Sequence, residues 1–351
     1  MPFNADQLAY AGRHAIDYFL KNDPIDQVNT ERPLLKKLTA GKTPYAGGLQ
    51  YVTEQLRYAN DSNFQSYFGD SQVSYNRKRT IQQAKFTWGS FHDGFGLNED
   101  ELAQNGITMT DEKNATPSDA EKVQLTNLLS ENMETLKLGF EENFDLMLHR
   151  DGSASSTDIP GLDALVSITP SASATIGALN QQTYSWWRNY ADIGISTSTS
   201  GNLIDRMEIA WRECMRYGGS KPDFILCGSD FLDAYRRDAS DTVNRRLNTS
   251  GKGNTAVDAS VDGVYFKGVE LVWDPVFDTL DSLDAPTVDW SKRCYFLNTR
   301  YLSLRPIKGH WMVPRKPPRV YDRYVHYWAL TSKAALTTSK RNAHAVLSLT
   351  Y

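Results

Sequence analysis

The chain has 351 residues, with 38 lysines and arginines against 42 acidic residues, so it is close to electroneutral. Proteins that coat nucleic acid are strongly basic, and this composition argues against that class. No run of about 18 apolar residues is present for a membrane span, and no secretory signal begins the chain. Three widely spaced cysteines are too few for a disulfide framework or a structural zinc site. We therefore expect a soluble intracellular protein.

The chemical motifs in the sequence are incomplete. Gly41-Lys42-Thr43 resembles a phosphate-binding loop, but Lys36 stands where the first glycine of that loop belongs. Residues 258–262 begin like a calcium loop, but Val269 stands where the closing acid belongs. The six histidines form no His–His pair four residues apart and have no nearby cysteine. We expect no catalytic residue, no metal site and no cofactor.

One enzymatic alternative remains open. Asp158, Asp163 and Asp192 surround the pair Trp186 and Trp187 in the sequence. Paired carboxylates beside aromatic rings are typical of carbohydrate-active enzymes, where the separation of the two carboxylates decides the chemistry. The sequence does not set that separation.

The first part of the chain predicts a helix followed by an arm. Residues 4–20 have the apolar spacing of a short amphipathic helix. The polar, proline-marked segment up to Gly48 predicts an extended arm. We expect this arm to dock through three buried leucines, Leu34, Leu35 and Leu38.

Two strand-like stretches follow, residues 49–58 and 72–88, with a turn at Gly69-Asp70 between them. Both faces of this ribbon are largely polar, and a two-stranded ribbon without an apolar face is not stable alone in water. We expect it to lie across the body of its own subunit or across a neighbour. A solvated tip is the alternative for its outer third.

The strongest helix signal begins after the ribbon. Thr116 is a good N-cap, and Pro117 suits the first helical position. Apolar residues then recur every three or four positions as far as residue 149, which predicts a helix about 50 Å long. These residues are Leu125, Leu128, Leu129, Met133, Leu136, Phe140, Phe144 and Met147.

Residues 156–298 have an α/β pattern. A helix over 200–217, with Met207 and Met215 facing inward, ends at Gly218-Gly219. A buried strand over 224–227 and a second helix follow, then a loop over 247–260 and strands over 264–273 and 294–297. Alternation over 324–351 predicts that the C-terminus belongs to a sheet.

Charge is segregated along the chain. Residues 300–323 hold seven basic residues and one acid, whereas residues 274–289 hold five acids and no base. The basic segment, with its interleaved aromatic residues, suits a nucleic-acid surface. The two segments equally suit contacts between copies of the chain. Two solvated loops are the third possibility.

The order of these elements is arm, long polar hairpin, long helix, α/β domain and return to a sheet. With its local strings, it resembles the major capsid protein of tailed bacteriophages (Caudoviricetes), of the Hong Kong 97 type, from about residue 33 to residue 351. The strings are Pro33-Leu34-Leu35 with Gly47-Gly48, then residues 84–88, 159–162, 184–189 and 295–302. Each string is weak alone, and their order and spacing carry the resemblance.

The resemblance implies an α+β Hong Kong 97-like fold in four parts. Residues 1–45 would be an N-terminal arm, and residues 46–95 an extended β-hairpin loop. Residues 96–157 and 300–351 would form a peripheral domain with a long spine helix and a β-sheet. Residues 158–299 would form an α/β axial domain.

The resemblance also implies a virion protein without enzymatic activity. It would be assembled in the host cytoplasm into the hexamers and pentamers of an icosahedral head around double-stranded DNA. A separate scaffolding protein, a portal and a decoration protein are the expected further partners, and no membrane is expected. The expected contacts between subunits are Arg77, Lys78, Arg79, Lys85, Trp186, Trp187 and Arg188. An encapsulin-like nanocompartment shell, filled with cargo enzyme instead of DNA, is the alternative on the same fold.

Overall fold

The computed structural model describes residues 29–47, 50–100, 119–198, 201–218, 220–244, 264–284, 286–318 and 325–350. It divides into two compact units. The first contains residues 90–144 and 307–333, and the second contains residues 31–89, 145–306 and 334–351. The predicted helix at 4–20, the predicted helix start at 116–118 and the predicted loop at 247–260 lie outside the described residues. Among the described helices, none combines the length and the apolar character that crossing a bilayer requires.

A six-stranded mixed sheet is the centre of the second unit. β14 runs parallel to β6, β7 runs parallel to β9, and the other pairs are antiparallel. Every residue of β14, β10 and β7 is buried, as expected for strands covered on both faces. The strands in spatial order are β6 (Tyr190–Ile195), β14 (Ala345–Leu349), β10 (Arg293–Leu297), β7 (Phe224–Cys227), β9 (Val269–Trp273) and β8 (Val264–Phe266).

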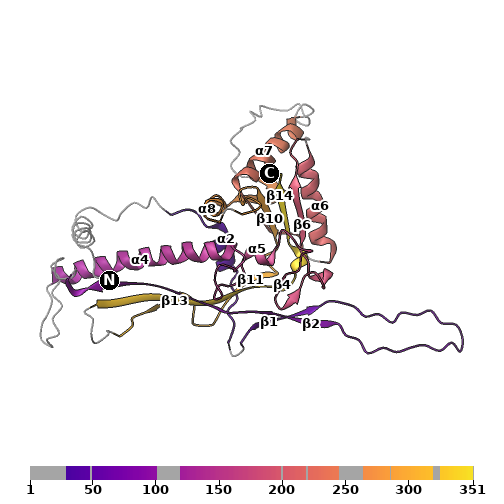
Figure 1. Cartoon of the computed structure of the whole chain (residues 1–351), viewed down its shortest axis with the longest axis horizontal. Coiled ribbons are helices and arrows are strands. Elements are labelled where there is room, and N and C mark those ends of the chain that lie inside the picture. The colour runs from indigo at the N-terminus through magenta and orange to yellow at the C-terminus, as the bar shows by residue number, and fades with distance from the viewer. Residues whose placement is uncertain are drawn as a thin grey trace. The chain divides into compact units, whose positions relative to one another are not determined.

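Helices cover both faces of this sheet (Figure 1). α6 (Asn202–Arg216) and α7 (Ser229–Asn244) share one core with the first face, where Trp211 packs edge-on against Phe296. On the second face, Phe277 of α8 (Pro275–Asp284) packs against Tyr295. Tyr295 and Phe296 are neighbours on β10 and so point to opposite faces. This arrangement confirms the predicted α/β character of the region.

The first unit is built on β13 (Val325–Thr338). β3 (Gly89–Asn98) and β12 (Val313–Arg315) pair with it. The part of α4 (Asp119–His149) that belongs to this unit contributes Phe144, which packs edge-on against Phe91 and Trp311. β13 continues into the second unit, where β11 (Leu302–Pro306) pairs with its last five residues.

Two local predictions are wrong. The arm is helical over α2 (Pro33–Ala40), with proline at the first position, although its three leucines are buried as expected. Residues 264–273 are not one strand, because positive φ angles at Lys267 and Gly268 form a two-residue hairpin turn between β8 and β9. The prediction that the C-terminus belongs to a sheet is confirmed by β14, although the segment contains two strands, β13 and β14, which belong to different sheets.

The inward face of α6 differs from the prediction at one end. Met207 is buried, but Met215 is 43% exposed, and Cys214 takes the buried position instead. Trp211 supplies most of the ring contacts of this helix. The helix ends before Gly218, whose φ of 66° confirms the predicted stop.

We expect Gly161→Ala to destabilise the second unit. A Cβ at Gly161, which precedes α5 (Leu162–Leu165), would lie 2.5 Å from the carbonyl oxygen of Leu148 and 2.7 Å from that of Met147. Such backbone crowding typically costs about 1–3 kcal/mol of unfolding free energy, measurable by urea denaturation. Gly41→Ala is the matched control, since its Cβ would meet nothing closer than 3.7 Å. Equal losses in the two variants would contradict the crowding.

Candidate functional site

The base of the polar ribbon is anchored on its own subunit. β1 (Val52–Arg57) and β2 (Ile81–Phe86) pair antiparallel, with Val52 opposite Phe86. The side chains of Val52, Leu56, Ala84 and Phe86 are buried, so the expectation of a ribbon without an apolar face is wrong for its base. The ladder is also shorter than predicted, at six residues in each strand.

Further contacts hold this base. The backbone N–H of Lys85 donates to the carbonyl oxygen of Gly177 at 2.9 Å, in the turn between β4 (Thr175–Ile176) and β5 (Leu179–Asn180). The Arg305 guanidinium lies 2.7 Å from the Glu54 carboxylate. The ring of Tyr58 stacks on Trp186 with centroids 5.7 Å apart. These contacts end at Tyr58, one residue beyond Arg57, the last residue of the β1–β2 ladder.

Beyond its base the ribbon is exposed. Residues 60–79 contain no strand, and all their side chains are exposed except that of Asn63, which is half-buried. Side chains hold the two halves of this loop together: the backbone N–H of Arg79 donates to the Asp61 carboxylate at 2.9 Å, and that of Ser74 donates to the Gln65 side chain at 3.3 Å. The predicted turn at Gly69-Asp70 is confirmed. Figure 1 shows this segment extending well beyond β1 and β2.

Four aromatic rings stand in water on this outer ribbon. Phe64 and Phe68 are each 92% exposed, Tyr75 is 91% exposed and Tyr67 is 71% exposed. Single exposed apolar residues are ordinary, but several large rings on one segment usually mark an interaction site. The sequence analysis weighed the polarity of the ribbon and missed these rings, although the run from Phe64 to Phe68 was a visible signal.

The predicted basic contacts also lie on the ribbon. Arg77, Lys78, Arg79 and Lys85 are exposed, and none of them forms an ion pair with another described residue. Their contact with a neighbouring subunit stays a prediction.

The three predicted contacts at residues 186–188 have different environments. Trp187 is 2% exposed and donates its indole N–H to the carbonyl oxygen of Ile176 at 3.0 Å, so it is a core residue that offers no surface to a partner. Trp186 is half-buried beneath Tyr58. Arg188 donates to the carbonyl oxygens of Gln181 and Gln182.

Two of the three carboxylates weighed for a sugar site, Asp163 and Asp192, have structural partners. Asp163 accepts from the buried guanidinium of Arg293 at 3.0 Å and from the hydroxyl of Tyr295 at 3.3 Å. Asp192 lies 3.4 Å from the Arg206 guanidinium. With Trp187 buried as well, the paired tryptophans do not form the aromatic surface that the enzymatic alternative requires.

The sequence analysis missed a buried ionic cluster in the second unit. His149 lies in the last turn of α4. Its Nδ1 is 2.8 Å from the backbone carbonyl oxygen of Asp145, and its Nε2 is 2.9 Å from a carboxylate oxygen of Asp274. All three side chains are fully buried. The available signal was the spacing of Asp145 and His149, which are four residues apart on one helix face. It was missed because the sequence analysis considered only His–His pairs and nearby cysteines.

This cluster suits a protonated imidazole better than a metal ion. Asp145, His149 and Asp274 are residues of the types that ligate metals, and among the described residues they lie close enough together to hold an ion. Nδ1 must carry a proton to bond a carbonyl oxygen, and Nε2 faces a carboxylate. Burial alone would lower the pKa of His149, but the carboxylates of Asp145 and Asp274 outweigh it and raise that pKa to about 9. Burial raises the pKa of Asp145 to about 6, against the opposing effect of His149.

The acidic segment at 274–289 is occupied within its own unit. Asp274 bonds to His149, and Asp278 accepts from the Ser229 hydroxyl. Asp281 accepts from the backbone N–H groups of Trp290 and Ser291. Asp284 accepts from Arg150, and Asp289 accepts from Lys292. They are therefore engaged inside the chain, which weakens the idea that they meet the basic segment of another copy.

We expect stability to fall as pH rises from about 6.5 to about 9. The folded state holds the His149 proton more tightly than the unfolded chain, in which histidine titrates near 6.5, so this contribution is lost through that window. Asp145 acts in the same direction between its ordinary value of 3.8 and about 6. Urea unfolding across pH should show the upper slope shrink in His149→Gln but persist in His92→Gln, which changes an exposed histidine. An unchanged slope in His149→Gln would refute the buried ion pairs.

The sequence and the structure were compared with those of known proteins. No protein-family model matches the sequence, and no curated protein matches it significantly. Solved structures do match. A chain of the Cyanophage A-1(L) capsid asymmetric unit aligns with a TM-score of 0.65 at 15% identity, covering 94% of this chain and 97% of that one.

Two further structures agree over nearly the whole chain. The capsid of Myoviridae phage XM1 aligns with a TM-score of 0.54 at 15% identity, covering 94% of this chain and 97% of that one. A chain of Gordonia phage Cozz aligns with a TM-score of 0.54 at 15% identity, covering 96% of this chain and 94% of that one. The predicted fold class is thereby confirmed: the chain has the Hong Kong 97-type fold of tailed-phage capsid proteins.

Proposed function

We propose that this chain is the major capsid protein of a tailed bacteriophage, which self-assembles into the hexamers and pentamers of an icosahedral head. The exposed outer ribbon is the observation that carries the proposal. Residues 60–79 place four aromatic rings in water on a segment that its own subunit does not cover. The fold supports the same reading, because it is the fold of solved phage capsids.

The energetics favour a neighbouring subunit as the cover. Fully burying a phenylalanine-sized side chain contributes roughly 1.5–3 kcal/mol. The conformational entropy lost when the ribbon becomes ordered offsets part of that gain. In a closed ring of subunits, however, every subunit makes the same contact, so the gain repeats at each interface. Four rings per subunit therefore give a strong driving force for association. Arg77, Lys78 and Arg79 then serve as charged contacts on the same outer ribbon, and Lys85 serves as one at its base.

The proposed parts follow the predicted boundaries. Residues 1–45 are the arm, and residues 46–95 are the extended loop that reaches over the adjacent subunit. Residues 96–157 with 300–351 form the peripheral domain, whose spine helix is α4 (Asp119–His149). Residues 158–299 form the axial domain, which holds most of the six-stranded sheet.

The proposed partners are those of a phage head. The shell encloses double-stranded DNA without reading its sequence, and it is assembled in the host cytoplasm with a separate scaffolding protein and a portal. A decoration protein is a further partner. The chain acts as a building block and not as an enzyme. An encapsulin-like shell is the alternative, and cargo enzyme in place of DNA inside purified particles would favour it.

Removing the outer ribbon should block assembly and spare the fold. We expect a variant with residues 62–76 replaced by a short glycine–serine turn to stay soluble, because the buried residues of β1 and β2 remain. Sedimentation velocity with electron microscopy should show capsomers or shells for the natural chain and only free subunits for this variant.

Two substitutions separate ring burial from loop length. The double variant Phe64→Ser, Phe68→Ser keeps the loop and removes two rings, so it should assemble less well than the natural chain. Gln72→Ser, at an exposed polar position of the same loop, is the matched control and should assemble normally. Normal shells from the shortened variant would refute the proposed role of the ribbon, and a natural chain that forms no capsomers or shells under any condition would refute the proposed function.

A further inference from the structure

The three cysteines are far apart in the sequence, but the fold places two of them side by side. Cys227 on β7 and Cys294 on β10 stand directly opposite each other in the antiparallel pair that these strands form. Cross-strand partners project from the same face of a sheet. Both side chains accordingly belong to the hydrophobic core that α6 and α7 share with the sheet. All three cysteines are free thiols in the structure.

The hydrogen bonds of the ladder determine what kind of cross-strand pair this is. The backbone N–H of Gly228 donates to the carbonyl oxygen of Arg293 at 3.0 Å. Gly228 and Arg293 are the next opposite residues along the ladder, so they form a hydrogen-bonded pair. The two kinds of pair alternate along antiparallel strands, which makes Cys227 and Cys294 a non-hydrogen-bonded pair. The Cα atoms of such a pair are about 4.5 Å apart.

This separation suits a disulfide bond. The Cα atoms of bonded cysteines are roughly 4.4–6.8 Å apart, and a non-hydrogen-bonded pair lies within that range. The Sγ of Cys227 lies 3.4 Å from the carbonyl oxygen of Val272 on β9. A thiol is a weak donor, so rotating this side chain toward β10 gives up little. The bond therefore requires side-chain rotation and no change of strand register.

The third cysteine is separate from this pair. Cys214 belongs to the same core but lies on α6, outside the ladder. Burial and then the neighbouring Cys227 thiol raise the pKa of Cys294, whereas burial and then Glu213 raise the pKa of Cys214 to about 12. Cys227 is therefore the cysteine that stands beside Cys294.

We propose that Cys227 and Cys294 form a redox-sensitive crosslink, which is a pair of thiols in a reducing environment and a disulfide between β7 and β10 in an oxidising one. Cells keep cytosolic thiols reduced, whereas disulfides persist outside the cell. The bond joins two neighbouring strands inside the six-stranded sheet. It also closes the long loop between residues 227 and 294, which restricts the unfolded chain and so stabilises the fold. Both cysteines belong to one subunit, so the proposal does not rest on assembly.

Oxidised glutathione is a suitable oxidant, and thiol–disulfide exchange is the route. One protein thiol loses its proton, and its sulfur attacks a sulfur of oxidised glutathione. This step forms a mixed disulfide, breaks the glutathione S–S bond and releases one glutathione thiolate. The second protein thiol loses its proton, and its sulfur attacks the protein sulfur of the mixed disulfide, which releases the second glutathione thiolate. The two protons end on the two glutathiones, so the protein loses two electrons and oxidised glutathione gains them.

Burial decides when this exchange can happen. Both cysteine side chains are 0% exposed. Burial raises the pKa of Cys227 to about 12 and raises that of Cys294 well above its ordinary value. Because the thiolate is the reacting species, the folded sheet protects both thiols. We therefore expect fast exchange while the chain folds and slow exchange once the sheet has formed.

Refolding the full-length chain from urea tests the proposal, with oxidised glutathione in one sample and reduced glutathione in the other. After free thiols are alkylated, mass spectrometry of unreduced fragments should show Cys227 joined to Cys294 in the oxidised sample only, with Cys214 alkylated in both. The oxidised chain should also unfold at a higher urea concentration. Cys294→Ala should abolish both effects. Cys214→Ala is the matched control, since it changes a buried cysteine of the same core, and it should retain them.

Producing the chain in cells with an oxidising or a reducing cytoplasm gives the same comparison without refolding, so poor refolding does not leave the question open. Alkylated Cys227 and Cys294 in the folded, oxidised chain would overturn the proposal. So would a bond from either residue to Cys214 or to glutathione in most molecules. A lower urea midpoint for the oxidised chain would also overturn it, because the folded sheet would then not accommodate the bond.

Discussion

The outer ribbon is the constraint on which the account of this protein depends. Residues 60–79 are exposed almost without exception, and they include rings at Phe64, Phe68 and Tyr75 that are more than nine-tenths exposed. A two-stranded ribbon has no core of its own and is marginal in water. Under the proposed function, the missing cover is another copy of the chain, so the stability of the ribbon and the closure of the shell are one property.

The rest of the second unit provides a fixed platform for that ribbon. Its base is held by buried residues of β1 and β2, by the contact between Glu54 and Arg305 and by the stack of Tyr58 on Trp186. The end of the spine helix is held to the start of α8 by the buried bond between His149 and Asp274. Because a buried ion pair tolerates little displacement, this joint sets its geometry firmly at the cost of desolvating its charges.

Local sequence signals predicted most elements but not their environment. The long helix, the strand at 224–227 and the turn at Gly69-Asp70 follow from periodicity and turn residues, which are properties of short segments. The hairpin between β8 and β9 was missed because Lys267 has a positive φ, which is uncommon for lysine and therefore cannot be predicted from the residue type. Strands 325–338 and 345–349 were merged because one alternating pattern cannot show that the chain changes sheets.

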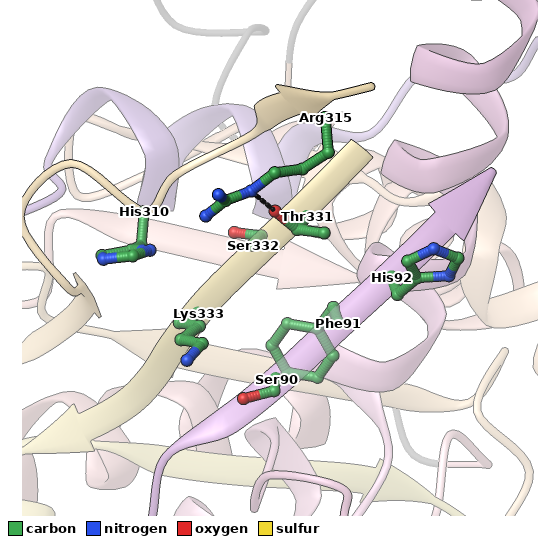
Figure 2. A pocket seen from close by; sticks show the side chains of 8 residues that line it. All are labelled: Ser90, Phe91, His92, His310, Arg315, Thr331, Ser332 and Lys333. Atoms are coloured by element: carbon green, nitrogen blue, oxygen red, sulfur yellow. Dashed lines mark hydrogen bonds between the residues drawn. The ribbon is translucent and has the colours of Figure 1, made fainter. Parts of the chain in front are cut away.

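The candidate sites were harder to predict for the same reason. Trp187 and Trp186 are neighbours in the sequence, yet one lies in the core and the other lies under Tyr58, which only the tertiary packing decides. His149 and Asp274 are 125 residues apart, so no local motif joins them. A cavity of about 170 Å³ in the first unit likewise brings together residues of β3, β12, β13 and the loop at His310, which lie far apart in the sequence (Figure 2). By contrast, the polarity of the outer ribbon did indicate from the sequence that this segment has no core of its own.

Hydrogen–deuterium exchange on free subunits and on assembled particles tests the central claim most directly, because it reports on the ribbon itself. The backbone amides of residues 60–79 should exchange rapidly in free subunits and slow by at least tenfold in particles, while the amides of β10 and β14 should be protected in both states. Particles in which residues 60–79 exchange as fast as in free subunits would contradict the account.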